Sequence, residues 1–264
     1  MPLDERGFRL AMGLRPLDHN QWFERDAEAN AQCAAKTALL DHHYEEVVAV
    51  TPEGTVASGE VAAMIATFVG APLTTNDHPL VAASRLVADD LCVMVRTRDD
   101  WVLAAAVVCS PSRWSLREKI GTSLDAIHET VPGYAEALAS STRTRFDRLR
   151  PERSFWRLNW TLLDDPALFQ PSVRRRAPQG DPAAWWFRVE RQTLRALPSS
   201  GAVLFTIRTY VTALPELLSA DPEHGARLLR ALDTAPEAST DYKGWRGVAD
   251  ALRATLSSPD RRQD

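Results

Sequence analysis

The sequence has little of what marks several common classes of protein. No apolar run approaches the roughly 20 residues that a membrane-spanning helix needs. The start, MPLDERGFRL, carries acidic residues and no apolar core, so we expect a cytoplasmic protein without a secretory leader. Basic residues are not in excess either, because 31 Lys and Arg stand against 35 Asp and Glu, a net charge of -4. Nucleic acid and anionic membrane surfaces are therefore not favoured partners.

Cysteine pairs and the common catalytic motifs are also missing. Cys33, Cys92 and Cys109 are odd in number and widely spaced, which predicts reduced core thiols rather than a disulfide framework. The chain contains no G-x-G-x-x-G, no G-x-x-x-x-G-K-[ST], no G-x-S-x-G and no H-E-x-x-H. Dinucleotide-binding, P-loop, α/β-hydrolase and zinc-protease functions therefore have no signature here.

The pattern of apolar residues predicts a globular α+β protein. Helical spacing runs over residues 20–42, 58–69, 134–149, 226–232 and 242–256, with a broken helical pair over 115–128. Strand-like segments cover residues 45–50, 91–96, 101–109, 155–163, 185–197 and 202–214. Turn-like residues 97–100 and 198–201 predict two antiparallel hairpins. We therefore expect one domain over residues 1–264, with an antiparallel sheet of about five strands flanked by helices.

Histidines are the first place to look for a metal ligand or an acid–base group. His42 and His43 are adjacent, so their rings point to different sides of a helix and do not form the i, i+4 pair of a zinc site. His128 differs, because it follows an apolar helical stretch and precedes the sequence Val131-Pro132-Gly133. Spacing alone still favours a packed or capping role for His128.

A polar set within a predicted strand is the second candidate. Strand alternation over RVERQ places Arg188, Glu190 and Gln192 on one face, and a polar set on a covered face must be paired or functional. A cross-strand ion pair of Glu190 with Arg208 or Arg157 is the structural alternative. Asp89 and Asp90, at the mouth of the first hairpin, fit the capping of a turn.

Several ordered blocks together resemble one family, the haem-binding alpha subunit of haem-dependent oxidative N-demethylases. The resemblance spans nearly the whole chain, and its most specific part is IH at 127–128 with VPG at 131–133, followed by RLNW at 157–160. The remaining blocks are MGLRPL (12–17), Trp22 with Asp26, DDL (89–91), CSPSRW (109–114), EKIG (118–121), VERQTL (189–194), LP (197–198) and FTIRTY (205–210). Thr130 stands where the family has proline, and Asp89-Asp90 replaces its Glu-Asp pair.

The resemblance implies a PAS-like haem-binding domain with helical additions at both ends. It implies haem b as cofactor and His128 as the axial iron ligand. This role differs from the packed or capping role that spacing alone favours for His128. The haem propionates need bidentate cations, and Arg157, Arg191 and Arg208 are the candidates, with Lys119 behind them. Trp160 is a candidate stacking wall for the porphyrin, although a core role fits its ring as well.

The family's activity implies an oxygenase component. The haem would activate O2 with electrons from a separate flavin or iron–sulfur reductase, since no motif for flavin, NADPH or an iron–sulfur cluster is present in this chain. The substrate would be a small secondary amine, whose methyl group leaves as formaldehyde. Glu190 is the candidate that holds the substrate ammonium, with Tyr210 or Asn159 as hydrogen-bonding partner. The competing hypotheses are a PAS-like haem sensor without turnover, and an interaction protein that has lost haem.

Overall fold

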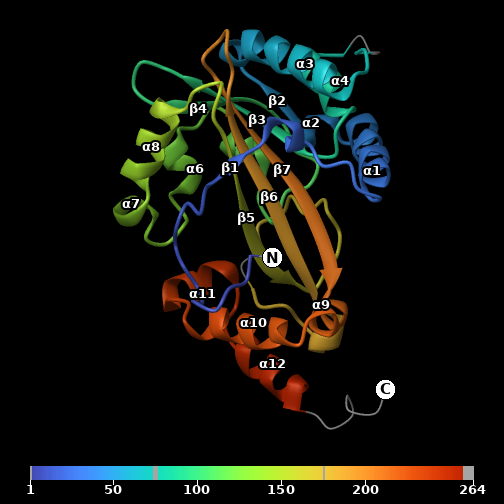
Figure 1. Ribbon diagram of the computed structural model, residues 1–264, viewed down its shortest axis with the longest axis vertical. Coiled ribbons are helices and arrows are strands. Elements are labelled where there is room, and N and C mark those ends of the chain that lie inside the picture. The colour runs from blue at the N-terminus through green and yellow to red at the C-terminus, as the bar shows by residue number, and fades with distance from the viewer. Residues whose placement is uncertain (1, 74–76, 175, 258–264) are drawn as a thin grey trace.

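A seven-stranded antiparallel sheet runs through the computed structural model, which describes residues 2–73, 77–174 and 176–257 (Figure 1). The strand order is β1-β5-β6-β7-β3-β4-β2, so the sheet is open, with β1 and β2 at its edges. The strands are β1 (Arg15–Leu17), β2 (Val48–Val50), β3 (Asp90–Arg96), β4 (Trp101–Val107), β5 (Ser154–Leu163), β6 (Trp186–Ala196) and β7 (Val203–Ala213).

The α+β class is confirmed, but the expected number of about five strands is wrong. The three residues of β1 are too few to show an alternating pattern, and β1 forms only by pairing with β5. Strand β2 is shorter than expected, because Tyr44–Val47 forms a helical turn, α2, before the extended residues begin. Both edges of the sheet are thus short segments that tertiary pairing stabilises.

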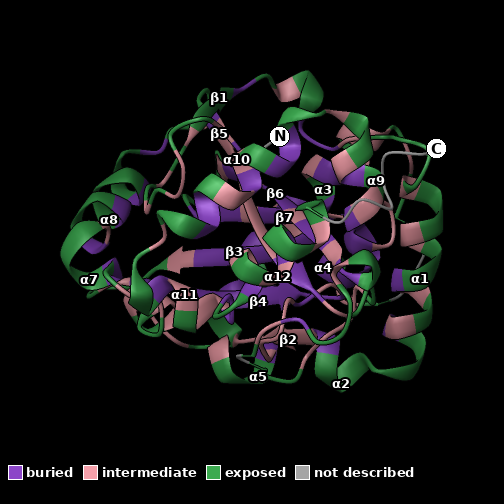
Figure 2. Cartoon of the chain, turned by 90° about the horizontal axis from the view of Figure 1, so that it is seen from below, coloured by how far each residue is buried: buried purple, intermediate pink, exposed green. Residues whose placement is uncertain are grey.

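Two groups of helices cover opposite faces of the sheet. The first face, here called the α6 face, lies under α5 (Leu116–Lys119), α6 (Leu124–His128) and α8 (Ala139–Arg148), which share a core with Cys92 and Leu194, and α7 (Tyr134–Ala137) packs on α8. The second, the α3 face, lies under α1 (Ala29–His42), α3 (Thr55–Val69) and α4 (Pro79–Ser84), which pack on Leu91 and Leu204. Figure 2 shows the buried residues concentrated on the central strands, while the outer sides of α7 and α1 are exposed.

The C-terminal helices form a third cluster at one end of the sheet (Figure 1). They are α9 (Leu214–Ala220), α10 (Glu223–Asp233), α11 (Glu237–Lys243) and α12 (Val248–Ser257). The expected single helix over residues 242–256 is wrong, because Gly244 and Gly247 adopt left-handed φ values of 67° and 75° and separate α11 from α12. Within the described residues, no helix combines the length and the apolar character that crossing a bilayer requires.

The N-terminal segment also differs from the expected helix over residues 20–42. A short 3-10 helix, η1 (His19–Gln21), is capped by the Asp18 carboxylate, and α1 begins only at Ala29. Between them, the Asp26 carboxylate accepts hydrogen bonds from the backbone N–H of Glu28 and from the guanidinium of Arg208 on β7. This tertiary contact holds the chain away from helical geometry where the apolar spacing alone would continue the helix.

Two carboxylates fix loops at the ends of strands. Asp90 is fully buried, and its two oxygens accept from the backbone N–H groups of Cys109 and Ser110 at 2.8 and 2.9 Å. Glu60 of α3 accepts from the N–H groups of Ser199 and Ser200 at 2.6 and 2.8 Å, which holds the turn between β6 and β7. The expected capping role of the Asp89-Asp90 pair is thus met by Asp90.

Two glycines close together in sequence should respond oppositely to alanine. A Cβ on Gly54 would lie 2.5 Å from the carbonyl oxygen of Ala104 in β4, whereas a Cβ on Gly59, inside α3, meets nothing within 4 Å. We expect Gly54→Ala to lower the free energy of unfolding by about 1–3 kcal/mol through overpacking. Gly59→Ala should raise it by about 0.5–1 kcal/mol, because glycine is entropically unfavourable within a helix. Urea unfolding of both variants tests this, and a stabilising Gly54→Ala would contradict the close packing.

Candidate functional site

His128 ends helix α6, and its ring is held by two contacts. Nδ1 lies 2.8 Å from the carbonyl oxygen of Leu124, one turn earlier, and the ring stacks on Tyr134 with centroids 4.7 Å apart. A carbonyl oxygen only accepts, so Nδ1 carries the proton and Nε2 has a free lone pair. Among the described residues, Nε2 has no hydrogen-bond partner. In this tautomer Nε2 is the ring nitrogen that can donate a lone pair to a ligand-binding partner such as a metal ion.

The surroundings keep this imidazole neutral. Burial lowers the pKa of His128, and the positive charges of Arg157 and Lys119 lower it further, against the opposing effect of the hydrogen bond to Leu124. A neutral ring is the form that ligates iron. The ammonium group of Lys119 donates to the carbonyl oxygen of Ile127 at 2.9 Å, so this lysine closes the last turn of α6 beside His128. In this position it supports the helix end that presents the imidazole.

Glu190 lies on the α6 face, in the middle of the sheet. It pairs in register with Asn159 on β5 and Thr209 on β7, and directly paired residues share a face. Its Oε2 accepts from Asn159 Nδ2 at 3.2 Å and from Gln192 Nε2 at 2.9 Å. Oε1 lies 3.7 Å from Nε of Arg188, which is 1% exposed. The predicted polar face therefore exists, and the structure brings Glu190 and Asn159 together.

The ion pair of Glu190 is with Arg188 on its own strand, not with Arg157 or Arg208 across strands. The Arg188 guanidinium also donates to the carbonyl oxygens of Ser110 and Leu168, so it ties β6 to the loops beyond β4 and β5. The hydrogen bonds of the Arg188 guanidinium therefore stabilise the fold.

Arg157 is the cation on this face whose guanidinium has the fewest partners among the described residues. It pairs in register with Gln192, and its charge acts on both Glu190 and His128. Burial lowers its pKa, and its buried Nε has no hydrogen-bond partner among the described residues. A buried guanidinium donor without an acceptor is unfavourable on its own and suits an anionic ligand.

Lys243 completes this cluster and was missed from the sequence. Its Nζ donates to the Trp160 carbonyl oxygen at 2.8 Å, lies 3.4 Å from Asn159 Oδ1, and sits 4.9 Å from the ring centroid of Trp245. Burial lowers the pKa of Lys243 to about 8, although Glu190 opposes the shift. The residue closes a short polar helix some 50 positions beyond Glu190, and nothing in its local sequence points back to the sheet.

The depressed pKa of Lys243 predicts a pH dependence of stability. Between about pH 8 and 10.5 the unfolded lysine holds a proton that the folded one releases, so the free energy of unfolding rises with pH across this window. The rise should reach up to about 3 kcal/mol. Comparing the urea unfolding of wild type and Lys243→Met at pH 7.5 and 10 isolates this contribution, because other groups titrate alike in both. A constant difference between the two proteins would contradict it.

The other predicted site residues lie on the α3 face, away from Glu190 and His128. Arg191 pairs in register with Arg208, and its guanidinium donates to the carbonyl oxygens of Gln21 and Trp22 at 2.6 and 3.1 Å. Arg208 is 0% exposed and binds both oxygens of Asp26, at 2.8 and 3.0 Å. The sheet thus separates these two arginines from His128, and both hold the N-terminal segment.

Tyr210 and Trp160 also lie on the α3 face. The Tyr210 hydroxyl donates to Glu24, and burial together with this hydrogen bond raises the pKa of Tyr210. The structure does not bring Tyr210 to Glu190. Trp160 stacks between Phe187 and Trp245, with centroid distances of 5.4 and 4.6 Å, within the core of the C-terminal helices.

The cysteines offer no thiolate near neutral pH. All three are free, and burial raises the pKa of Cys92 and raises that of Cys109 to about 12. Within the part of the chain that the structure describes, no three His, Cys, Asp or Glu side chains converge on a point where they could hold a metal ion. A haem would need no such group, because the porphyrin would supply most of the iron's ligands and a single side chain could supply the remaining protein ligand.

This geometry defines a class of protein: an α+β fold in which one face of the sheet carries a buried arginine Nε without an acceptor and a carboxylate that accepts from two amides, while helix α6 on that face ends in a histidine with a free ring nitrogen. Residues 69–253 match the family described as HODM_asu-like, haem-dependent oxidative N-demethylase, alpha subunit-like. The match covers more than half of the chain, so the chain belongs to this family. The resemblance inferred from the sequence blocks is confirmed.

Proposed function

We propose that this chain is the haem-binding subunit of an oxygenase that removes a methyl group from a small secondary amine. One observation carries the proposal: Nδ1 of His128 is fixed by a backbone carbonyl and its Nε2 faces no protein partner within the described residues. Burial also lowers the pKa of His128, which favours the neutral ring. The orphaned Nε of Arg157 gives a second fit, because a propionate carboxylate would satisfy it. His128 would hold the iron of haem b, and Arg157 would neutralise a propionate.

When bound, the haem supplies the activation of O2, for which amino-acid side chains have no substitute. The overall reaction consumes the secondary amine, O2, two electrons and two protons, and gives the primary amine, formaldehyde and water. The family's designation as an alpha subunit supports electron supply from a separate reductase subunit. Flavin or iron–sulfur groups on that partner would provide the electrons.

In this proposal, Glu190 receives the substrate. Glu190 is 8% exposed, and its carboxylate is oriented by Asn159 and Gln192. Arg157 and Lys243 place positive charge beside it, which disfavours a second cation and so promotes loss of the ammonium proton. The neutral amine that results carries a nitrogen lone pair, the form of an amine that is readily oxidised.

We assign the residues of the α3 face a supporting role. Arg191, Arg208 and Tyr210 fix the N-terminal segment against β6 and β7, and Trp160 anchors the C-terminal helices on β5. They would keep the strands that carry Glu190 and Arg157 in register.

The test is to titrate the purified chain with hemin and to supply O2, a reductant and N-methylated secondary amines of increasing size. We expect a Soret band of stoichiometric intensity, and amine-dependent O2 consumption with an equal yield of formaldehyde. A protein that binds hemin but forms no formaldehyde with any amine would support the sensor hypothesis instead. A protein that stays colourless would exclude both.

A further inference from the structure

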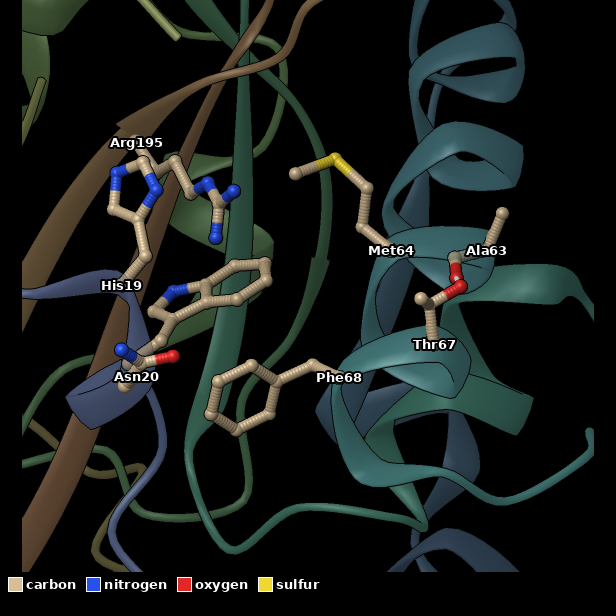
Figure 3. A pocket seen from close by; sticks show the side chains of 8 residues that line it. His19, Asn20, Ala63, Met64, Thr67, Phe68 and Arg195 are labelled. Atoms are coloured by element: carbon tan, nitrogen blue, oxygen red, sulfur yellow. Dashed lines mark hydrogen bonds between the residues drawn. The ribbon is translucent and has the colours of Figure 1, made fainter. Parts of the chain in front are cut away.

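A cavity of about 390 Å³ lies on the α3 face, on the other side of the sheet from His128 and Glu190. It opens between η1, the C-terminal half of β6 and helix α3 (Figure 3). Its lining consists of His19, Asn20, Trp22, Ala63, Met64, Thr67, Phe68 and Arg195. The volume is in the range of small-molecule sites. Neither the haem nor the amine of the proposed function uses these residues.

The polar groups of this cavity are mainly donors. Arg195 brings a guanidinium, stacked over the Trp22 ring at 4.3 Å, and no carboxylate is among the lining residues. The buried Nε of Arg195 has no hydrogen-bond partner within the described residues. The same holds for Nε1 of Trp22, a side chain that is only 1% exposed. Two buried donors without acceptors, one of them charged, lie in the wall of a single cavity.

The remaining titratable group in the wall adds no negative charge. His19 Nε2 lies 2.9 Å from the Ser154 hydroxyl. Burial lowers the pKa of His19, and the charge of Arg195 lowers it further while that of Asp18 raises it. The cavity therefore keeps the net positive charge of Arg195.

The opposite wall is apolar. Met64 and Phe68 come from successive turns of α3 and extend from the helix toward η1 and Arg195 (Figure 3), and Ala63 also lines the cavity. The Phe68 ring meets the Trp22 ring edge to face, at 5.7 Å between centroids. An aromatic and thioether wall suits a flat hydrocarbon body.

From these two walls we infer that the cavity binds a small carboxylate with a flat apolar body, such as an aromatic monocarboxylate. The carboxylate accepts from the Arg195 guanidinium and the Trp22 indole N–H, and the body packs on Met64 and Phe68. A neutral analogue of the same shape would leave the charge of the guanidinium unpaired. An inorganic oxyanion without an apolar body would leave the apolar wall exposed to water. Both should bind more weakly.

Benzoate is the probe, and the readout is the indole N–H signal of Trp22 in a nitrogen–proton correlation spectrum, assigned by its loss in Trp22→Phe. We expect saturable binding of benzoate, with a Kd of about 1 mM or tighter, and a downfield shift of that one signal. Benzamide and inorganic phosphate should each bind at least about tenfold more weakly. Equal binding of either compound would overturn the assigned ligand class, and an unmoved Trp22 signal at saturating benzoate would overturn the site.

Variants make the assignment specific. Arg195→Gln should weaken benzoate at least about tenfold, whereas Arg15→Gln should not, since Arg15 is an exposed arginine that lies over a different tryptophan, Trp156. Ala63→Phe fills the cavity from an exposed helix position, so it should block benzoate in a folded protein even if Arg195→Gln fails to fold. Unchanged affinity in Ala63→Phe, or equal losses in Arg195→Gln and Arg15→Gln, would contradict the inference.

Discussion

Replacing His128 by alanine is expected to abolish tight haem binding, with a loss of affinity of about 100-fold or more, since removing even an outer partner of a metal ligand lowers metal affinity 10–100-fold. The substitution removes the nitrogen whose lone pair is left free by the Leu124 hydrogen bond, while Arg157 and Glu190 remain. Hemin titration followed at the Soret band measures the effect. Added imidazole should restore the histidine-ligated spectrum, because the ring it replaces left a space beside Tyr134.

His42→Ala is the matched control, because His42 is an exposed histidine at the end of another helix, α1. It should bind haem as wild type does. If His128→Ala binds hemin with the wild-type affinity and spectrum, another residue is the iron ligand, and the proposed site is wrong.

Replacing Glu190 by glutamine should reduce amine turnover by about 100-fold to 1,000-fold while leaving haem affinity unchanged, the size of effect typical of a positioned acid–base group. Glutamine keeps the shape of the side chain but removes the negative charge that would receive the ammonium. Formaldehyde release under saturating O2 and reductant measures this loss.

Two controls separate chemistry from folding in this experiment. Glu152→Gln removes an exposed carboxylate before β5, away from Glu190, and should turn over the amine as wild type does. The thermal unfolding temperature of Glu190→Gln shows whether Arg188, which loses its ion pair, destabilises the fold. Wild-type turnover in a folded Glu190→Gln protein would remove Glu190 from the proposed mechanism.

Much of the fold follows from periodicity in the sequence. The long strands β6 and β7 and the turn between them were predicted nearly to their ends, because alternation over eleven residues on each strand is a strong signal. Edge strand β1 and the breaks at residues 22–28 and 244–247 were not. The first two depend on contacts with β5 and Arg208, and the third on left-handed glycines inside an apolar pattern.

The candidate site could be predicted only in part. Alternation placed Arg188, Glu190 and Gln192 on one face correctly, since that depends on neighbouring residues alone. The same alternation puts Arg191 on the opposite face, whereas the faces of Arg157 and Arg208 depend on the register of β5 and β7 against β6, which no local pattern encodes. Lys243 arrives through the packing of α11 on the edge of β5, a contact between segments 83 and 84 residues apart.

Because side chains alternate along β6, the number of residues between Glu190 and the following turn decides which face of the sheet each side chain takes. Glu190 and Arg191 are consecutive, yet one belongs with His128 and the other with Gln21, on opposite sides of the sheet. A single residue inserted between Arg191 and the hairpin tip that Glu60 holds would exchange their faces, so that Arg191 would point to the side of His128 and Glu190 to the side of Gln21 and Trp22. Natural insertions and deletions in this protein should therefore avoid the interior of β6 and accumulate in loops that leave its parity intact.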